Sequence, residues 1–153
     1  MKLIEDVPPR MSFTDEETRL LGEVLQAVKD EITGSDTTDP VIERLFPAAY
    51  DDPGAAGAFR DLTEGDLREE RLIRLVDTVE ELDATEGEVP LSGDTADRWI
   101  RVLNDARLVL GTRIEVSEDW DHELDPEDPE VAEKAVYVWL SAVQETVVQS
   151  LIG

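Results

Sequence analysis

The segment that most constrains the fold is residues 97–114, which read DRWIRVLNDARLVLGTRI. Apolar residues recur there every three to four positions, which is the spacing that places side chains on one face of an α-helix. The predicted inward stripe comprises Trp99, Val102, Leu103, Ala106 and Leu110. Ser92 is a suitable N-cap, and Gly111 is expected to end the helix. We therefore predict a central helix that begins after Ser92, runs to about Leu110 and packs against the other elements.

The same periodicity predicts helices on both sides of this segment. Thr14 and Glu17 have capping-box spacing, and aspartate followed by proline recurs as a helix start. The predicted helices cover residues 14–34, 40–46, 53–62, 63 to the break at Gly87, 92–110 and 129–151. The last of them is apolar on more than one side, which is typical of a helix at the centre of a bundle or at a contact between subunits.

Together these patterns predict an all-α fold, a single-domain bundle of about five to six helices over residues 1–153. Residues 1–11 are expected to be an extended lead-in, because Pro8 and Pro9 exclude a helix, and a short N-terminal strand fits there. Residues 115–128 are expected to form an acidic loop, and residues 112–116 are compatible with a short strand before it. We find no linker that would divide the chain into two domains.

The charge of the chain limits its partners. There are 14 lysines and arginines against 38 aspartates and glutamates, a formal net charge of −24. This excess disfavours non-specific binding to nucleic acid or to an anionic membrane, because phosphates are bound by clustered lysine and arginine. The chain has no cysteine, which excludes disulfides, zinc–thiolate sites and thiol redox switches within it. No apolar run is expected to approach a membrane span, so we predict a cytoplasmic protein with no membrane contact.

Four polar residues on or beside the central helix are candidates for a recognition surface: Asn104, Asp105, Arg107 and Arg113. A guanidinium can bind a carboxylate or phosphate through two hydrogen bonds, so the arginines suit an anionic ligand. The alternative is an internal network of salt bridges, which the abundance of acids favours. Spacing of four residues also predicts three ion pairs along the helix: Asp94–Arg98, Asp97–Arg101 and Arg101–Asp105.

A second basic cluster comprises Arg60, Arg68, Arg71 and Arg74. The last three are spaced by three residues, so a helix would carry them as a stripe that could contact DNA. Acidic residues are interleaved with these arginines, and no aromatic residue lies there to stack on a base. The pattern therefore favours a solvated face that pairs with itself.

The acidic loop and the rest of the chain offer little chemistry. Carboxylates from Asp119 to Glu130 have the spacing of a calcium-binding loop, but Leu124 occupies the position where the sharp turn needs glycine. The single histidine, His122, is expected to be exposed in this loop, and no GxGxxG, Walker or HExxH motif is present. We therefore predict no catalytic residue, no cofactor and no metal, and a protein that is not an enzyme.

The chain contains the stretches DPVIERLFPAAYDDPGAAGAFRDLTEGDLR, WIRVLNDARLVLGTRIEV and YVWLSAVQETVVQSLIG. These stretches resemble an actinobacterial family, long catalogued as a domain of unknown function and now labelled AosR-like. The resemblance extends from about Phe13 to Leu151 and is most specific over residues 99–113. It implies a small helical cytoplasmic protein with a role in transcriptional control under oxidative stress. It brings no catalytic motif, and a sensing mechanism based on a cysteine pair is excluded here.

Three functions stay open from the sequence. The first is a non-enzymatic regulatory adaptor that acts by protein–protein contact, with the transcription machinery as a partner and a homodimer through the C-terminal helix. The second is a regulator that binds DNA directly through a local basic face. The third is a helical domain that binds a small molecule or a metal. The net charge of −24 favours a basic protein partner over DNA, so we expect the adaptor.

Overall fold

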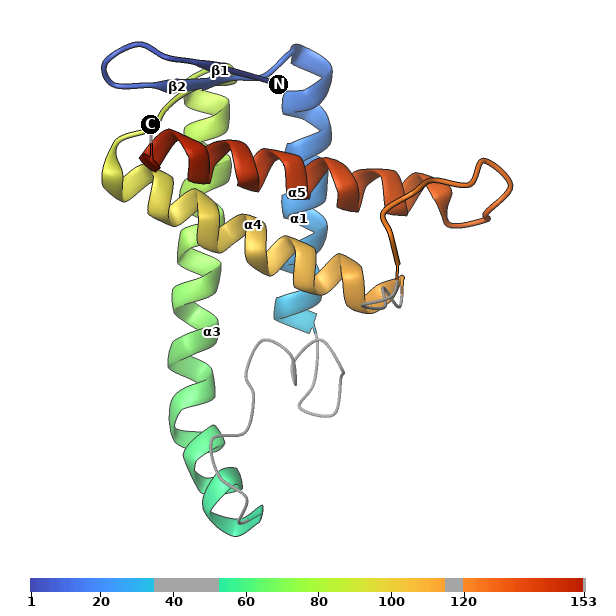
Figure 1. The fold of residues 1–153 in the computed structure, drawn as a ribbon. Coiled ribbons are helices and arrows are strands. Elements are labelled where there is room, and N and C mark those ends of the chain that lie inside the picture. The colour runs from blue at the N-terminus through green and yellow to red at the C-terminus, as the bar shows by residue number, and fades with distance from the viewer. Residues whose placement is uncertain (35–52, 115–119, 153) are drawn as a thin grey trace.

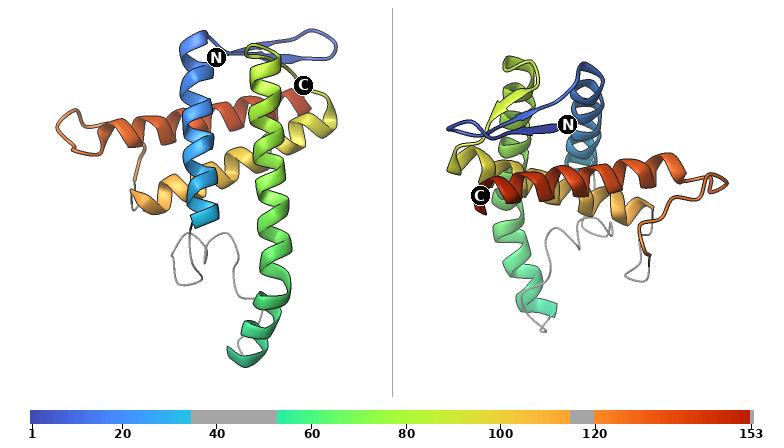
Figure 2. Two further views of the ribbon diagram at one scale, coloured as in Figure 1. Left: turned by 180° about the vertical axis from the view of Figure 1, so that it is seen from behind. Right: turned by 45° about the horizontal axis from the view of Figure 1, so that its top comes forward.

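The structure, a computed structural model, describes residues 1–34, 53–114 and 120–152, and within the second range it describes side chains from residue 67 onward. The elements are β1 (Lys2–Ile4), β2 (Arg10–Ser12), α1 (Asp15–Gly34), α3 (Pro53–Ala84), β3 (Glu88–Pro90), α4 (Gly93–Arg113) and α5 (Val131–Ile152). The helices α1 and α3 run side by side in one layer, and α4 and α5 cross them in a second layer (Figures 1 and 2). The fold is therefore mostly helical, as predicted.

The predicted number of helices is too high for the part of the chain that the structure describes, which contains four. Residues 53–62 and the helix predicted from residue 63 form one continuous helix, α3. Gly65 lowers helix propensity by only about 1 kcal/mol relative to alanine, and the strong helix formers beside it outweigh that cost. The helix predicted for residues 40–46 lies outside the described residues.

Helix α4 is the central element, as its apolar stripe predicts. It packs against α1, α3 and α5. Trp99 is 1% exposed, and the ring of Phe13 stacks on it with 5.8 Å between centroids. Phe13 also meets Trp139 of α5 edge-on at 6.5 Å, so three aromatic rings join the segment before α1 to both crossing helices. Aromatic pairs of this kind add to the free energy of burial, so this cluster helps to hold the two layers together.

The residues expected to be an extended lead-in form two strands of a small antiparallel sheet, in the order β1–β2–β3. Met11 pairs with Leu3 on one side and Val89 on the other, and Met11 and Val89 are fully buried. Glu88 lies on the opposite face, where it accepts hydrogen bonds from Ser12 Oγ at 2.6 Å and Arg10 Nε at 3.2 Å. The all-α prediction is therefore corrected by three strands of three residues each, too short to show an alternating pattern.

Gly87 makes the turn between α3 and β3. Its φ of +85° favours glycine, and an added Cβ would lie 2.6 Å from Thr18 Oγ1 and 3.0 Å from the carbonyl oxygen of Phe13. The amide of Gly87 donates to Leu82 O at 3.1 Å, and its carbonyl accepts from Phe13 N at 2.9 Å. The predicted break at Gly87 is thus confirmed, and the turn also attaches β3 to the start of α1.

Gly111 does not end α4, which contradicts the prediction from the sequence. The helix continues to Arg113, so the short strand suggested for residues 112–116 is also wrong over residues 112–114, the part that the structure describes. Gly111 is buried, and a Cβ there would lie 3.1 Å from Cε2 of Tyr137. The glycine therefore serves the close packing of α5 on α4, which local sequence cannot reveal.

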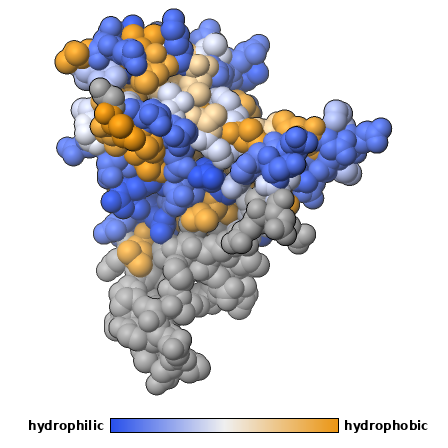
Figure 3. Space-filling model, in the orientation of Figure 1, coloured by the Kyte–Doolittle hydropathy of each residue, from blue (hydrophilic) through white to orange (hydrophobic). Residues whose placement is uncertain are grey.

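Helix α5 is more exposed than its apolar sequence suggests. Leu140, Val143 and Val147 are buried, whereas Leu151 and Ile152 are 51% and 74% exposed. Figure 3 shows apolar residues gathered at the C-terminal end of this helix. By length and composition α5 could cross a membrane, with a mean hydropathy of 1.2 and 17% of the most apolar window buried. The expectation that no run approaches a membrane span is therefore corrected.

Candidate functional site

The polar residues of α4 connect this helix to its neighbours. Asp105 is 2% exposed and accepts a hydrogen bond from Arg71 of α3. Burial raises the pKa of the Asp105 carboxyl, because a charged group loses its water there, and the guanidinium of Arg71 opposes that rise. Arg74 and Arg101 act in the same direction as Arg71 from further away. The carboxylate is thus enclosed by the chain's own cations, with little access for a ligand.

Arg107 extends in a different direction, toward α5. Its Nη1 donates to Gln144 Oε1 at 2.5 Å, and Gln144 Nε2 donates in turn to Ile100 O at 3.1 Å. The guanidinium also lies over the ring of Tyr137, 5.5 Å from its centroid. Since Gly111 lets this ring approach α4, the glycine and the arginine belong to the same contact between the two helices.

The other two candidates lie nearer the surface. Arg113 forms an ion pair with Glu31 of α1, in which Arg113 Nε donates to Glu31 Oε1 at 3.1 Å. Asn104 is exposed. The structure thus directs Asp105, Arg107 and Arg113 toward three different helices and does not bring them together in one cavity. Of the four, Asn104 and Arg113 are accessible to a partner without a change in the fold.

The ion pairs predicted along α4 form in part. Arg101 Nε donates to Asp97 Oδ2 at 2.9 Å, as the spacing predicts. Arg98 pairs instead with Glu81 of α3 at 2.6 Å, and Trp99 Nε1 donates to the same carboxylate oxygen at 2.8 Å. Asp105 pairs with Arg71, not with Arg101. Pairs between helices replace two of the three pairs within the helix, because α4 packs against α3 and brings Glu81 and Arg71 within reach.

The arginines of the second basic cluster are in part bonded to other residues of the fold or half-buried. Arg71 is bonded to Asp105, and Arg68 and Arg74 are half-buried. The side chain of Arg60 lies outside the residues whose side chains the structure describes. The described arginines of the stripe therefore do not stand out from α3 as a fully exposed basic face.

In the acidic loop the carboxylates bond to the backbone of the loop itself. Asp121, Asp125 and Asp128 each accept a hydrogen bond from the amide two residues later, at 3.0, 2.9 and 2.8 Å. His122 is exposed, and its ring lies 4.8 Å from that of Trp120 and 6.1 Å from that of Tyr137, centroid to centroid. The rings of Trp120 and Tyr137 are 5.9 Å apart, so the three rings form a triangle. Among the described residues no group of three or more His, Cys, Asp or Glu is arranged to hold a metal.

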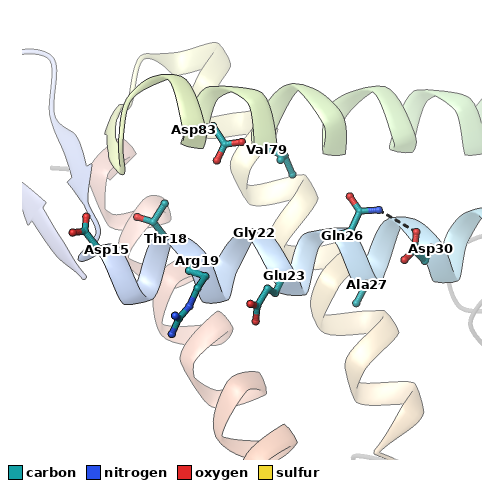
Figure 4. Close-up of a pocket in the computed structure, with 10 residues that line it drawn as sticks. All are labelled: Asp15, Thr18, Arg19, Gly22, Glu23, Gln26, Ala27, Asp30, Val79 and Asp83. Atoms are coloured by element: carbon teal, nitrogen blue, oxygen red, sulfur yellow. Dashed lines mark hydrogen bonds between the residues drawn. The ribbon is translucent and has the colours of Figure 1, made fainter.

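A feature that the sequence did not indicate is a surface groove of about 640 Å³, which we call the α1–α3 groove. It is lined by residues 15–30 on one side of α1 and by Val79 and Asp83 of α3. Figure 4 shows α1 and α3 in front, with the crossing helices α4 and α5 behind them. Gly22 lies at its middle, and four carboxylates and one arginine line it. The only feature of the sequence that could have pointed to this groove is Gly22, a glycine inside a strong helical pattern.

Comparison with known proteins places the chain in a family. The model of the family described as "Domain of unknown function (DUF2017)" matches residues 4–151. The chain belongs to the DUF2017 family. The resemblance to AosR-like proteins predicted from the sequence is confirmed, since proteins named "Oxidative stress regulator AosR" from Mycobacterium bovis and Mycobacterium tuberculosis are each 32% identical to it over 147 residues.

The match covers 81% of this DUF2017 chain and 66% of each of these relatives, so the chain spans just under two thirds of their length. No solved structure matches the chain. Because this DUF2017 member has no cysteine, any response to oxidants within this chain must use chemistry other than thiol exchange.

Proposed function

We propose that this chain is a non-enzymatic regulatory adaptor that acts by protein–protein contact in the cytoplasm, with the transcription machinery as its partner. The observation that carries the proposal is the similarity over 81% of the chain to proteins named oxidative stress regulators. The described structure adds a scaffold in which polar side chains of α4 bond to side chains of neighbouring helices. These bonds join α4 to each of the other helices, which suits a rigid platform for binding.

Charge favours a protein partner over DNA. The chain carries a net charge of −24, and contact with phosphates would require a basic face large enough to overcome it. Four arginines that could supply such a face, Arg71, Arg98, Arg107 and Arg113, bond to acidic or amide groups of the chain itself. A basic protein partner is instead attracted by the same charge, which also accelerates association.

Two surfaces are proposed to take part. The first is the exposed side of α4 and its end, where Asn104 and Arg113 are accessible. The second is the outer side of α5, which carries Val138 and Ala142 among few charged residues and which we propose as the contact of a homodimer. An apolar patch of this kind on a soluble protein is typical of an interaction surface.

The experiment is affinity purification of the tagged chain from its native cells, with and without nuclease, beside selection from fragmented genomic DNA at physiological salt. We expect a protein of the transcription machinery to co-purify in both samples and no DNA sequence to be enriched by the purified chain. Enrichment of a specific sequence, together with no protein that survives nuclease, would establish the direct DNA-binding alternative and refute the adaptor.

A further inference from the structure

The α1–α3 groove lies on the side of its layer that faces away from α4 and α5 (Figure 4). Most of its surface is apolar, and Val79 and Ala27 contribute to it. A smaller cavity of about 90 Å³ between Leu25 and Leu75 shares Gln26 and Val79 with it, which extends the apolar surface along both helices. The groove is therefore a long, shallow channel between two helices and not an enclosed pocket for a small molecule.

Gly22 is unexplained by the packing of the chain itself. A Cβ at Gly22 would meet no atom within 4 Å, whereas one at Gly87 would lie 2.6 Å from Thr18 Oγ1 and one at Gly111 would lie 3.1 Å from Tyr137 Cε2. Glycine inside a helix costs about 1 kcal/mol relative to alanine. No contact within the chain offsets the cost of Gly22 at the middle of α1. The missing side chain leaves the helix backbone bare at the centre of the groove. A bare backbone allows a partner to approach closely.

The carboxylates of the groove are available for a partner. Within the described residues, Asp15, Glu23 and Asp83 form no hydrogen bond or ion pair through their side chains. Asp30 accepts a single bond, from Gln26 Nε2 at 3.1 Å. Against these four carboxylates the described lining holds one cation, Arg19, so the groove is acidic. By contrast, two carboxylates outside the groove, Glu31 and Glu81, are bonded to arginines.

The shape of the groove indicates what kind of segment fits it. Both walls are helices whose backbone groups bond internally, so an added strand would find no edge to pair with. Asp15 and Asp30 are fifteen residues apart in α1, which at about 1.5 Å per residue gives a channel of about 22 Å. A helix of about four turns has this length, and its apolar stripe would lie over Gly22 with basic residues along its edges.

We propose that the α1–α3 groove binds a basic amphipathic helix of a partner protein, with Gly22 giving the closest approach and Glu23 and Asp83 pairing with its lysines or arginines. The inference rests on the proposed function as a protein-contact regulator and adds a further surface for contact with the partner. It differs from the surfaces of α4 and α5 named above.

The test is a ¹⁵N-amide NMR titration of the full chain with a four-turn peptide of lysine, leucine and alanine patterned as an amphipathic helix. A peptide of the same composition in scrambled order controls for charge attraction alone. We expect saturable shifts confined to residues 15–30 and 76–83, and weaker, dispersed shifts with the scrambled peptide. Shifts centred on the acidic loop would overturn the proposal. Shifts in the groove on concentrating the chain without peptide would do so too, since they would assign it to a second copy.

Variants sharpen the test. Gly22→Trp places a large ring at the middle of the groove, on a Cβ that meets no atom within 4 Å, and is expected to abolish binding, with its melting temperature reporting that it folds. Glu23→Gln/Asp83→Asn is expected to weaken binding about fivefold or more. Glu69→Gln/Glu70→Gln removes the same charge from exposed positions of α3 outside the groove and is expected to leave it unchanged. Equal losses in the two double variants would overturn the pairing.

Failure of this inference is distinguishable from failure of the proposed function. If the protein that co-purifies from native cells binds Gly22→Trp as tightly as the unaltered chain, the groove is not the contact and the adaptor stands. If no protein survives nuclease treatment, the adaptor itself fails.

Discussion

Removal of Arg71 is expected to destabilise the fold strongly, because it leaves the buried carboxylate of Asp105 without its closest cation. Breaking a buried pair at one partner costs about 3–5 kcal/mol. Arg74 and Arg101 also act on Asp105, and the side chain of Arg71 is 23% exposed. We therefore expect the loss of stability in Arg71→Met to lie near the lower end of this range, at about 3 kcal/mol. For a chain of this size the melting temperature should fall by about 6–12 °C.

The effect depends on pH in a definite direction. Burial raises the pKa of Asp105 above 3.8, so its protonated form favours the folded state. That contribution is complete below the ordinary pKa and is lost as the pH rises through the raised one. Arg71→Met removes an opposing charge and raises the pKa further, so the difference between variant and unaltered chain grows with pH above about 3.8.

Asp105→Asn reproduces the protonated carboxyl at neutral pH and completes a double-mutant cycle. Alone it should change stability by no more than about 1 kcal/mol, because the side chain of Arg71, which is 23% exposed, can reach water. In the double variant, Asp105→Asn should restore most of the stability that Arg71→Met removes. This corresponds to a coupling free energy between the two positions of about 2 kcal/mol or more. The assay is urea unfolding followed by tryptophan fluorescence. Additive effects of the two substitutions would refute a buried, mutually compensated pair.

Three further outcomes follow from the packing. Gly22→Ala should raise stability by about 1 kcal/mol in thermal unfolding, since its Cβ meets open space, and a loss of stability would show an unrecognised contact. Gly87→Ala should lower stability by about 2 kcal/mol or more, given the positive φ and the 2.6 Å approach to Thr18 Oγ1, with Gly34→Ala as a control that meets no atom within 4 Å. Sedimentation at tens of micromolar should detect a dimer that Val138→Lys/Ala142→Lys dissociates, and a monomer at all concentrations would contradict the contact through α5.

The helical part of the fold could be predicted because its signal is local and repeated. The stripe from Trp99 to Ala106 is buried as the spacing requires, and the Thr14–Glu17 capping box forms with both reciprocal bonds, at 3.1 and 3.0 Å. The short N-terminal strand suggested by the sequence is present as β1, but the other two strands and the sheet could not be predicted. Three residues carry no usable period, and the pairing of β2 with β3 depends on the turn at Gly87, far along the chain.

The site was harder to predict because its contacts are made between elements. Gly111 has the sequence of a helix stop, yet its neighbour is the ring of Tyr137 on α5, which no local pattern indicates. Arg98 bonds to Glu81 of α3 although Asp94 has the favourable spacing on its own helix. The α1–α3 groove forms only when the two helices lie side by side, so it cannot be read from local sequence. Gly22 is the only residue whose position in the sequence hints at it.

The account is tested most directly by the fraction of its protein partner that stays bound to the purified chain after nuclease treatment at physiological salt. An adaptor that works by protein contact predicts that the partner is retained in full and that the chain alone enriches no sequence from genomic DNA. Loss of the partner with the DNA, together with sequence-specific binding by the chain alone, would contradict the account.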